Sequence, residues 1–302
     1  MRIRRPKILV AAAAVATLAL TLTASPSLAA TQDVSPPGAN DFACKPSALH
    51  PYPVVLVPGT YETMLKNWAV MSPVLKHAGY CVFSLNYGVV DGIPASGPIE
   101  HSAAELGRFV HTVLNATRAK QVDLVGHSQG GMMPRYYLRF LGGTQTVHAL
   151  IGIAPSNHGT TLKPNPLSYV PGVSTGGDGP PSTLPAPGQL TTPPTGDFNA
   201  AGSEQMAGSA FLTKLNAGGD IQGHVFYTVI ATTHDEIVTP YTSEALAGPA
   251  RQVTDVVIQH FCPLDPIEHD QTPNDPVVQQ LVLAALSNKA GPLAPGFRPK
   301  CL

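Results

Sequence analysis

The chain has 302 residues, of which 43% are hydrophobic and 12% charged, and its formal net charge is −1. This charged fraction is about half of the usual share, and the near-neutral balance without a basic run argues against a nucleic-acid-binding protein. About 270 residues remain after a leader-like start, enough for one sizeable hydrophobic core.

The first 29 residues have the pattern of a secretory signal peptide. Basic residues crowd the first seven positions, an apolar run covers 8–22, and the small residues Ser27 and Ala29 offer a cleavage site before Ala30. The apolar run is short for a bilayer span, and no basic stop-transfer segment follows it. We therefore expect a secreted, extracellular protein whose mature form has no membrane span.

Strands and helices are predicted to alternate from residue 50 onward. Short apolar runs ended by turn residues indicate buried strands, and apolar residues at helical spacing indicate the helices between them. The predicted strands are 54–57, 80–85, 121–125, 147–153, 225–231 and 253–259, and the predicted helices lie near 68–78, 103–113, 129–141, 199–215 and 277–286. This alternation predicts an α/β fold with a mostly parallel central sheet and helices on both faces, forming one domain over 30–302.

A segment rich in proline and glycine interrupts this alternation. About half of the residues in 163–196 are proline or glycine, a composition that does not form regular structure. A solvent-exposed insertion is one interpretation. A flap over the binding cleft is the other, because the insertion leaves from the carboxyl end of a strand, where α/β sheets bind their ligands.

Four cysteines in an exported chain predict two disulfides. Cys44 precedes the first strand and Cys81 lies in the second, whereas Cys262 follows the last strand and Cys301 is the penultimate residue. The pairs Cys44–Cys81 and Cys262–Cys301 would each tie a terminal segment to the core. No two cysteines have C-x-x-C spacing, and we expect neither a zinc site nor any other metal site.

The sequence Gly126-His127-Ser128-Gln129-Gly130 directly follows the third predicted strand. A G-x-S-x-G pattern between a strand and a helix places the serine on a sharp, strained turn, the nucleophile elbow. The serine hydroxyl is then exposed above the sheet edge. Its glycines are expected on steric grounds, because a Cβ atom there would collide with the neighbouring strand or helix. Ser128 is the candidate nucleophile.

A nucleophilic serine needs a histidine base that a carboxylate orients, and in such hydrolases the chain order is serine, acid, histidine. Asp235 follows the carboxyl end of strand 225–231 and is the candidate acid, with its neighbour Glu236 as the competitor. His269 lies in a loop ahead of the last helix and is the candidate base. The alternative, His260, is expected to close the last strand, where a ring more often packs into the sheet.

The oxyanion of the tetrahedral intermediate needs preorganised donors. The backbone N–H of Gln129, the residue after the nucleophile, is one candidate. The turn after the first strand reads Pro58-Gly59-Thr60, and the N–H of Thr60 is the second candidate, with the Thr60 hydroxyl as a third donor.

Several of these segments together resemble the secreted α/β-hydrolase lipases of actinobacteria, the bacterial class 2 lipase family. The resembling segments are V-P-G-T ending at Thr60, G-H-S-Q-G-G-M-M-P-R-Y from Gly126, A-P-S-N-H-G-T from Ala154, Y-T-V-I-A-T-x-x-D-E-x-V-T-P-Y from Tyr227, and D-P-x-x-H ending at His269. The oxyanion and elbow segments are also similar to yeast lipase B. A departure is Pro58, since many lipases have a histidine before the glycine. The resemblance implies an α/β-hydrolase fold and a carboxylic ester hydrolase of triacylglycerol lipase type.

The expected partner is a lipid or other ester, bound at an oil–water interface or in solution. We expect no organic cofactor, and we expect the protein to be a monomer. A polyester or cutin depolymerase, a phospholipase or an acyltransferase would use the same residues. A non-catalytic envelope-binding protein on a hydrolase scaffold is the alternative from a different class. It would show loss of the base, the acid or the elbow glycines, and the sequence retains all of them.

Overall fold

The computed structural model describes residues 34–161 and 199–301. The predicted signal peptide 1–29 and the proline- and glycine-rich insertion 163–196 lie outside the described residues.

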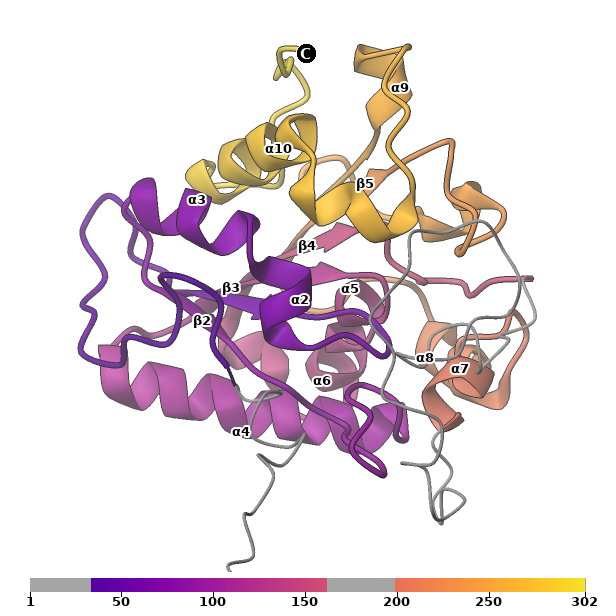
Figure 1. Ribbon diagram of the computed structural model, residues 1–302, viewed down its shortest axis with the longest axis horizontal. Helices are drawn as coiled ribbons and strands as arrows, with labels where there is room; N and C mark the ends of the chain where they lie inside the picture. The colour runs from indigo at the N-terminus through magenta and orange to yellow at the C-terminus, as the bar shows by residue number, and fades with distance from the viewer. Residues whose placement is uncertain (1–33, 162–198, 302) are drawn as a thin grey trace, which may run out of the picture.

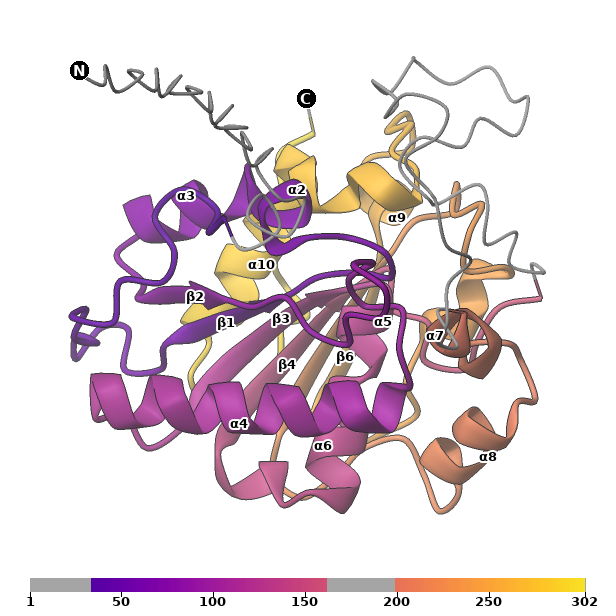
Figure 2. The same cartoon turned by 60° about the horizontal axis from the view of Figure 1, so that its bottom comes forward.

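The centre of the fold is a six-stranded sheet in which all neighbouring strands are parallel. The strands lie side by side in the order β2-β1-β3-β4-β5-β6 (Figure 2). Their bounds are β1 Val54–Val57, β2 Val82–Ser84, β3 Val122–His127, β4 Val147–Ile153, β5 Phe226–Ala231 and β6 Val253–Val257. The chain runs from β1 to β2 on one side of β1 and continues with β3 on the other side, so the strand order reverses between β1 and β3, the second and third strands of the sheet.

Helices cover both faces of the sheet, which explains why its central strands are apolar on both sides. Along β1, Val55 and Val57 pack with the hydrophobic cluster of α4 and α6, whereas Val54 and Leu56 pack with that of α2, α3 and α10. Figure 1 shows these two layers above and below the strands. The helices are α2 Met64–Trp68, α3 Met71–His77, α4 Ile99–Thr117, α5 Gln129–Met132, α6 Pro134–Phe140, α7 Ala200–Glu204, α8 Ala210–Asn216, α9 Ile258–Phe261 and α10 Pro276–Ser287, with 3-10 helices at Gly143–Gln145, Tyr241–Glu244 and His269–Asn274.

Three predicted helices are each divided in the structure. The helix near 68–78 is α2 and α3, the helix after the elbow is α5 and α6 with Pro134 at the first position of α6, and the helix at 199–215 is α7 and α8. Gly208, between α7 and α8, has φ +80°, which a continuing helix does not allow. Apolar spacing predicted the buried faces but not the breaks between the pieces.

The last predicted strand is shorter than expected. β6 ends at Val257 and α9 begins at Ile258, so the expectation that His260 closes a strand is wrong: His260 lies in a short, partly exposed helix. An apolar residue at 253, 256 and 258 fits a strand and a helical turn about equally well, because so short a run has no decisive period.

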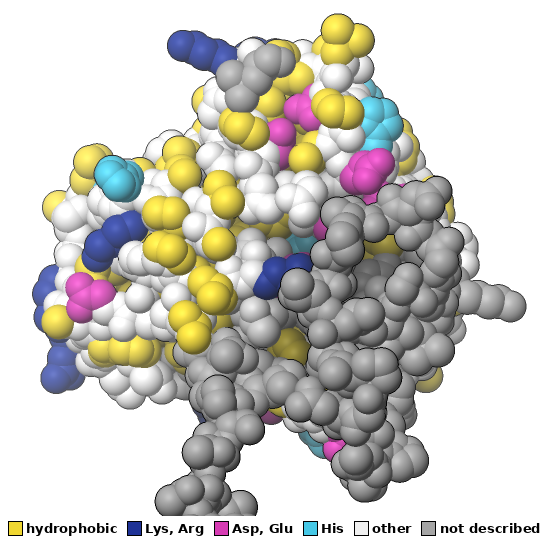
Figure 3. Space-filling model, in the orientation of Figure 1, with side chains coloured by type: hydrophobic (Ala, Val, Ile, Leu, Met, Phe, Trp, Pro, Cys, Tyr) yellow, Lys and Arg dark blue, Asp and Glu magenta, His cyan; other side chains and the backbone are white. Residues whose placement is uncertain are grey.

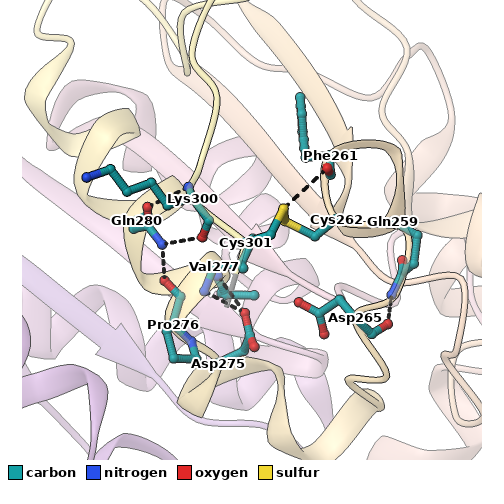
Figure 4. The surroundings of a disulfide bond; sticks show 11 residues. Gln259, Phe261, Cys262, Asp265, Asp275, Pro276, Val277, Gln280, Lys300 and Cys301 are labelled. Atoms are coloured by element: carbon teal, nitrogen blue, oxygen red, sulfur yellow. Dashed lines mark hydrogen bonds between the residues drawn. A yellow bond between two sulfur atoms is a disulfide. The ribbon is translucent and has the colours of Figure 1, made fainter.

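Both expected cysteine pairs are joined, Cys44 to Cys81 and Cys262 to Cys301. Around the second disulfide, the side chain of Gln280 in α10 accepts from the Lys300 N–H at 2.9 Å and donates to the Lys300 carbonyl at 3.1 Å (Figure 4). The carboxyl-terminal segment is therefore held both to α9 through sulfur and to α10 through hydrogen bonds.

The surface combines few charges with single exposed apolar side chains. In the view of Figure 3, hydrophobic side chains are interspersed with polar surface, and acidic side chains are scattered. Across the two described ranges, no helix is both long and apolar enough to cross a membrane.

Candidate active site

The carboxyl ends of the parallel strands bring the expected site residues to one edge of the sheet. Thr60 follows β1, Ser128 follows β3, Asp235 follows β5 and His269 follows β6. In open α/β sheets, ligands bind at this edge where the strand order reverses, and here the reversal is between β1 and β3.

Ser128 lies on the turn between β3 and α5 with φ 54° and ψ −123°, a backbone conformation that L-residues rarely adopt. Its N–H donates to the Ile153 carbonyl of β4, and its own carbonyl accepts from the Gly131 N–H, both at 2.9 Å. The turn leaves no room for side chains around it, because a Cβ atom on Gly130 would lie 2.1 Å from the carbonyl oxygen of Val57. The strain predicted for this residue is therefore present, and neighbouring strands hold it in place.

Asp235 and His269 are joined by a short hydrogen bond, with 2.6 Å between Asp235 Oδ2 and His269 Nδ1. The other carboxylate oxygen, Oδ1, accepts from the N–H groups of Ile237 and Val238 at 2.9 and 2.6 Å, which fixes the direction of the carboxylate. Burial opposes a charge on the His269 ring, but the hydrogen bond and the negative charge of Asp235 outweigh it and raise the pKa of His269. A raised pKa makes this imidazole a better proton acceptor.

Ser128 and His269 line the same cavity, and both are largely buried. The remaining lining residues are Gly59, Thr60, Tyr61, Glu62, His127, Ser156, Thr160, Gly202, Gln205, Ile237, Val238 and Asp270. Asp235 is absent from this lining and lies behind His269, as expected of a residue that orients the base without meeting the substrate.

The turn expected to hold an oxyanion carries a side-chain network that the sequence did not predict. The Thr60 hydroxyl donates to Gln129 Oε1 at 2.9 Å, and Gln205 Nε2 donates both to Thr60 Oγ1 at 2.9 Å and to Gln129 Oε1 at 3.0 Å. Ser156 Oγ in turn donates to Gln205 Oε1 at 2.7 Å. The Thr60 hydroxyl would have to leave Gln129 before it could donate to an oxyanion.

The competing acid Glu236 and two further histidines, His148 and His158, have different surroundings. Glu236 Oε2 accepts from the backbone N–H of His269 at 3.3 Å, so this hydrogen bond is made to the main chain of the candidate base. His148 in β4 pairs with Asp123 at 2.7 Å, at the opposite end of the sheet. His158 lies between Ser243 and Asp220, with both ring nitrogens hydrogen-bonded to them.

Two buried acids near the site also escaped prediction. Glu62 lines the cavity and pairs with Lys66 at 2.9 Å. Glu244 is fully buried, and burial together with the negative charge of Asp235 raises its pKa well above the usual range. Glu62 was missed because it follows the oxyanion turn without a motif, and Glu244 because only the folded chain brings it to Asp235.

Within the described part of the chain, no group of three or more His, Cys, Asp or Glu side chains is arranged to hold a metal ion.

The match to a known family covers most of the chain, including every candidate site residue. Residues 51–282 match the family model described as lipase (class 2). The chain belongs to the class 2 lipase family. The matched region runs from just before β1 into α10, so Ser128, Asp235 and His269 all lie within it.

Solved structures show the same fold. Lipase B of Aspergillus fumigatus is similar with a TM-score of 0.64 and 20% identity, over 86% of this chain and 57% of that one. A structure from the pair LipS and LipT, described as metagenome-derived lipolytic enzymes, is similar with a TM-score of 0.52 and 13% identity, over 84% of this chain and 99% of that one. This class 2 lipase family member has the α/β-hydrolase fold, and it spans a little over half the length of the Aspergillus lipase.

Proposed function

We propose that this protein is a carboxylic ester hydrolase of triacylglycerol lipase type that forms an acyl-enzyme on Ser128. The observation that carries the proposal is the 2.6 Å hydrogen bond between Asp235 and His269 beside a cavity that His269 shares with the strained Ser128. Membership of the class 2 lipase family supports the same chemistry.

In the proposed mechanism, the Ser128 hydroxyl attacks the ester carbonyl while His269 Nε2 takes its proton. Asp235 holds the Nδ1–H of His269, which fixes the tautomer that leaves Nε2 free to accept, and then stabilises the imidazolium. His269 afterwards protonates the leaving alcohol. A water molecule attacks the acyl-enzyme in the second half of the cycle, with the same residues acting in the same order.

The developing oxyanion would be held by two backbone N–H groups. Gln129 is the first residue of α5, so its N–H has no acceptor within that helix and is available to a ligand. Thr60 supplies the second N–H from the turn after β1. Removal of one such donor typically costs about 10²–10³ in kcat.

An acylglycerol is the proposed substrate class, and an extracellular location is the proposed setting. The two disulfides support an oxidising compartment. A series of soluble and emulsified esters of increasing acyl length would separate a lipase from a short-chain esterase, with a polyester film and a phospholipid as further arms.

The decisive experiment is covalent labelling with a fluorophosphonate, followed by peptide mapping. We expect the label on Ser128 in the native protein, and we expect Ser128→Ala to lose both the label and p-nitrophenyl ester hydrolysis. An unlabelled Ser128 in folded protein without esterase activity would contradict the proposal and favour a non-catalytic binding protein. An active Ser128→Ala variant would also contradict it, because another residue would then be the nucleophile.

A further inference from the structure

A buried chain of hydrogen bonds connects the oxyanion turn to the loop that carries His269. The Gly59 N–H donates to Asn67 Oδ1 at 2.7 Å, Asn67 Nδ2 lies 3.1 Å from His127 Nδ1, and His127 Nε2 lies 3.1 Å from the backbone carbonyl of His269. The two side chains in the middle are 3% and 1% exposed, so water does not compete for these bonds.

The direction of each bond in this chain follows from its first member. A backbone N–H can only donate, so the oxygen of the Asn67 amide faces Gly59 and its NH₂ group faces His127. His127 Nδ1 must then be the acceptor, and the proton of a neutral ring lies on Nε2, where it is donated to the His269 carbonyl. One orientation of Asn67 and one tautomer of His127 satisfy all three bonds.

The nearest carboxylate does not offer a better arrangement. Glu62 Oε2 lies 3.6 Å from His127 Nδ1, farther than the Asn67 amide, and the other carboxylate oxygen pairs with Lys66. A proton on Nδ1 would face the Asn67 NH₂ group and break the chain at its centre.

We propose that Asn67 and His127 are positioning residues that set the distance between the oxyanion turn and the catalytic base. Gly59 precedes the donor Thr60, His127 precedes Ser128, and the carbonyl that His127 holds belongs to His269 itself. One imidazole thus fixes the positions of donor turn, nucleophile and base relative to one another. The role rests on the function proposed above.

Two substitutions of His127 distinguish the two ends of this chain of hydrogen bonds. In His127→Gln the longer amide keeps a donor near the place of Nε2 and can still reach the His269 carbonyl, whereas in His127→Asn the shorter amide stays near the place of Nδ1 and loses that contact. Since misplacement of a reacting group by about 1 Å can cost about 10²-fold, we expect His127→Asn to lose about 100-fold in kcat with KM within about threefold of wild type. We expect His127→Gln to lose clearly less.

His148→Gln is the matched control, because His148 is also a buried histidine with both ring nitrogens bonded to protein, at the far end of the sheet. It should lose stability and keep kcat. The proposal is overturned if both His127 variants keep the wild-type kcat. It is also overturned if His148→Gln, with a similar loss of stability, loses as much kcat as the His127 variants.

A second readout does not depend on ester hydrolysis. In protein labelled with ¹⁵N-histidine at pH 7, the His127 ring, assigned by the signal missing in His127→Gln, should show an unprotonated Nδ1 and a protonated Nε2. A proton on Nδ1 would overturn the inference. If Ser128→Ala remained active while this tautomer was found, the proposed function would fail and the hydrogen-bond chain would stand.

Discussion

A Cβ atom on Gly126 would lie 1.8 Å from the carbonyl oxygen of Gly130. The two glycines flank Ser128, and the contact is between main-chain segments that end β3 and begin α5, so neither can move aside without opening the turn.

We expect Gly126→Ala to destabilise the protein by about 3 kcal/mol or more, at the upper end of the usual cost of overpacking. The measurement is the free energy of unfolding from urea denaturation. Gly296→Ala is the control, since a Cβ atom there meets nothing within 4 Å and should change stability little. Equal effects of the two substitutions would show that the elbow relaxes more easily than its geometry indicates.

Replacement of the buried acid should damage the reaction far more than replacement of its neighbour. In Asp235→Asn the two backbone N–H groups that donate to Oδ1 hold the amide oxygen in that place, so the NH₂ group faces His269 Nδ1. The proton of the ring is then forced onto Nε2, and Nε2 can no longer accept the proton of Ser128. We expect kcat to fall by about 10⁴-fold. Glu236→Gln should cost no more than about tenfold, because it weakens a single hydrogen bond to the main chain. Steady-state kinetics on one soluble ester measures kcat of both variants. A larger loss of kcat in Glu236→Gln than in Asp235→Asn would identify Glu236 as the acid.

The buried Glu244 should make stability depend on pH. Its pKa is raised well above the usual 4.5 by burial and then by the charge of Asp235, so the folded state keeps a proton that the unfolded state has released. Stability is therefore lost as the pH rises from about 4.5 toward the folded pKa, by up to about 1.4 kcal/mol per pH unit.

We expect Glu244→Gln to resemble the wild type in stability near pH 4 and to be more stable at pH 8. Urea denaturation at pH 4, 6 and 8 measures the difference between the two proteins. Glu268→Gln is the control, because a substitution at an exposed side chain should change stability little. Parallel curves for wild type and Glu244→Gln would mean that Glu244 is ionised in the folded protein.

The two disulfides should differ in their effect on activity although they close loops of similar length, with separations of 37 and 39 residues. Loop entropy predicts that loss of either one costs about 4 kcal/mol. Only the loop closed by Cys262 and Cys301 contains His269. We therefore expect Cys262→Ser with Cys301→Ser to lower activity well below the unfolding temperature.

The matched pair is Cys44→Ser with Cys81→Ser. The loop that this disulfide closes contains Thr60, but the pairing of β1 with β2 and β3 holds the turn after β1 without the disulfide. This variant should therefore lower the unfolding temperature and leave activity at 25 °C nearly unchanged. Thermal denaturation and ester hydrolysis of both double variants test this. Equal losses of activity would indicate that His269 is held by its own hydrogen bonds and not by the disulfide.

The sheet was predictable because its strands are apolar on both faces and end in clear turn residues. Val54–Val57 could be recognised as a buried strand from four apolar residues before Pro58 and Gly59. The breaks within predicted helices were not, since Gly208 or Pro134 can be tolerated or can end a helix depending on what packs beside it. His260 was misplaced for a different reason: a run of a few apolar residues has no unique period.

The site divides in a similar way. The serine, the acid and the histidine expected from chain order lie at one edge of the sheet because each follows the carboxyl end of a parallel strand. Gln205, Asn67 and Glu244 carry no local signal, and their contacts join positions up to 145 residues apart in the chain. Pairings of that kind depend on how layers pack, which a short motif does not encode.

The backbone of Ser128 has a further consequence. A residue with φ 54° and ψ −123° pays about 1–3 kcal/mol for its conformation, and glycine would adopt it at little cost. Under the proposed function, folding and catalysis would favour different residues at position 128, because glycine would give the more stable protein and serine would give the reactive one. If Ser128 is the nucleophile, selection for thermal stability alone would favour a glycine there that abolishes activity, so stabilised variants would have to be selected for turnover as well.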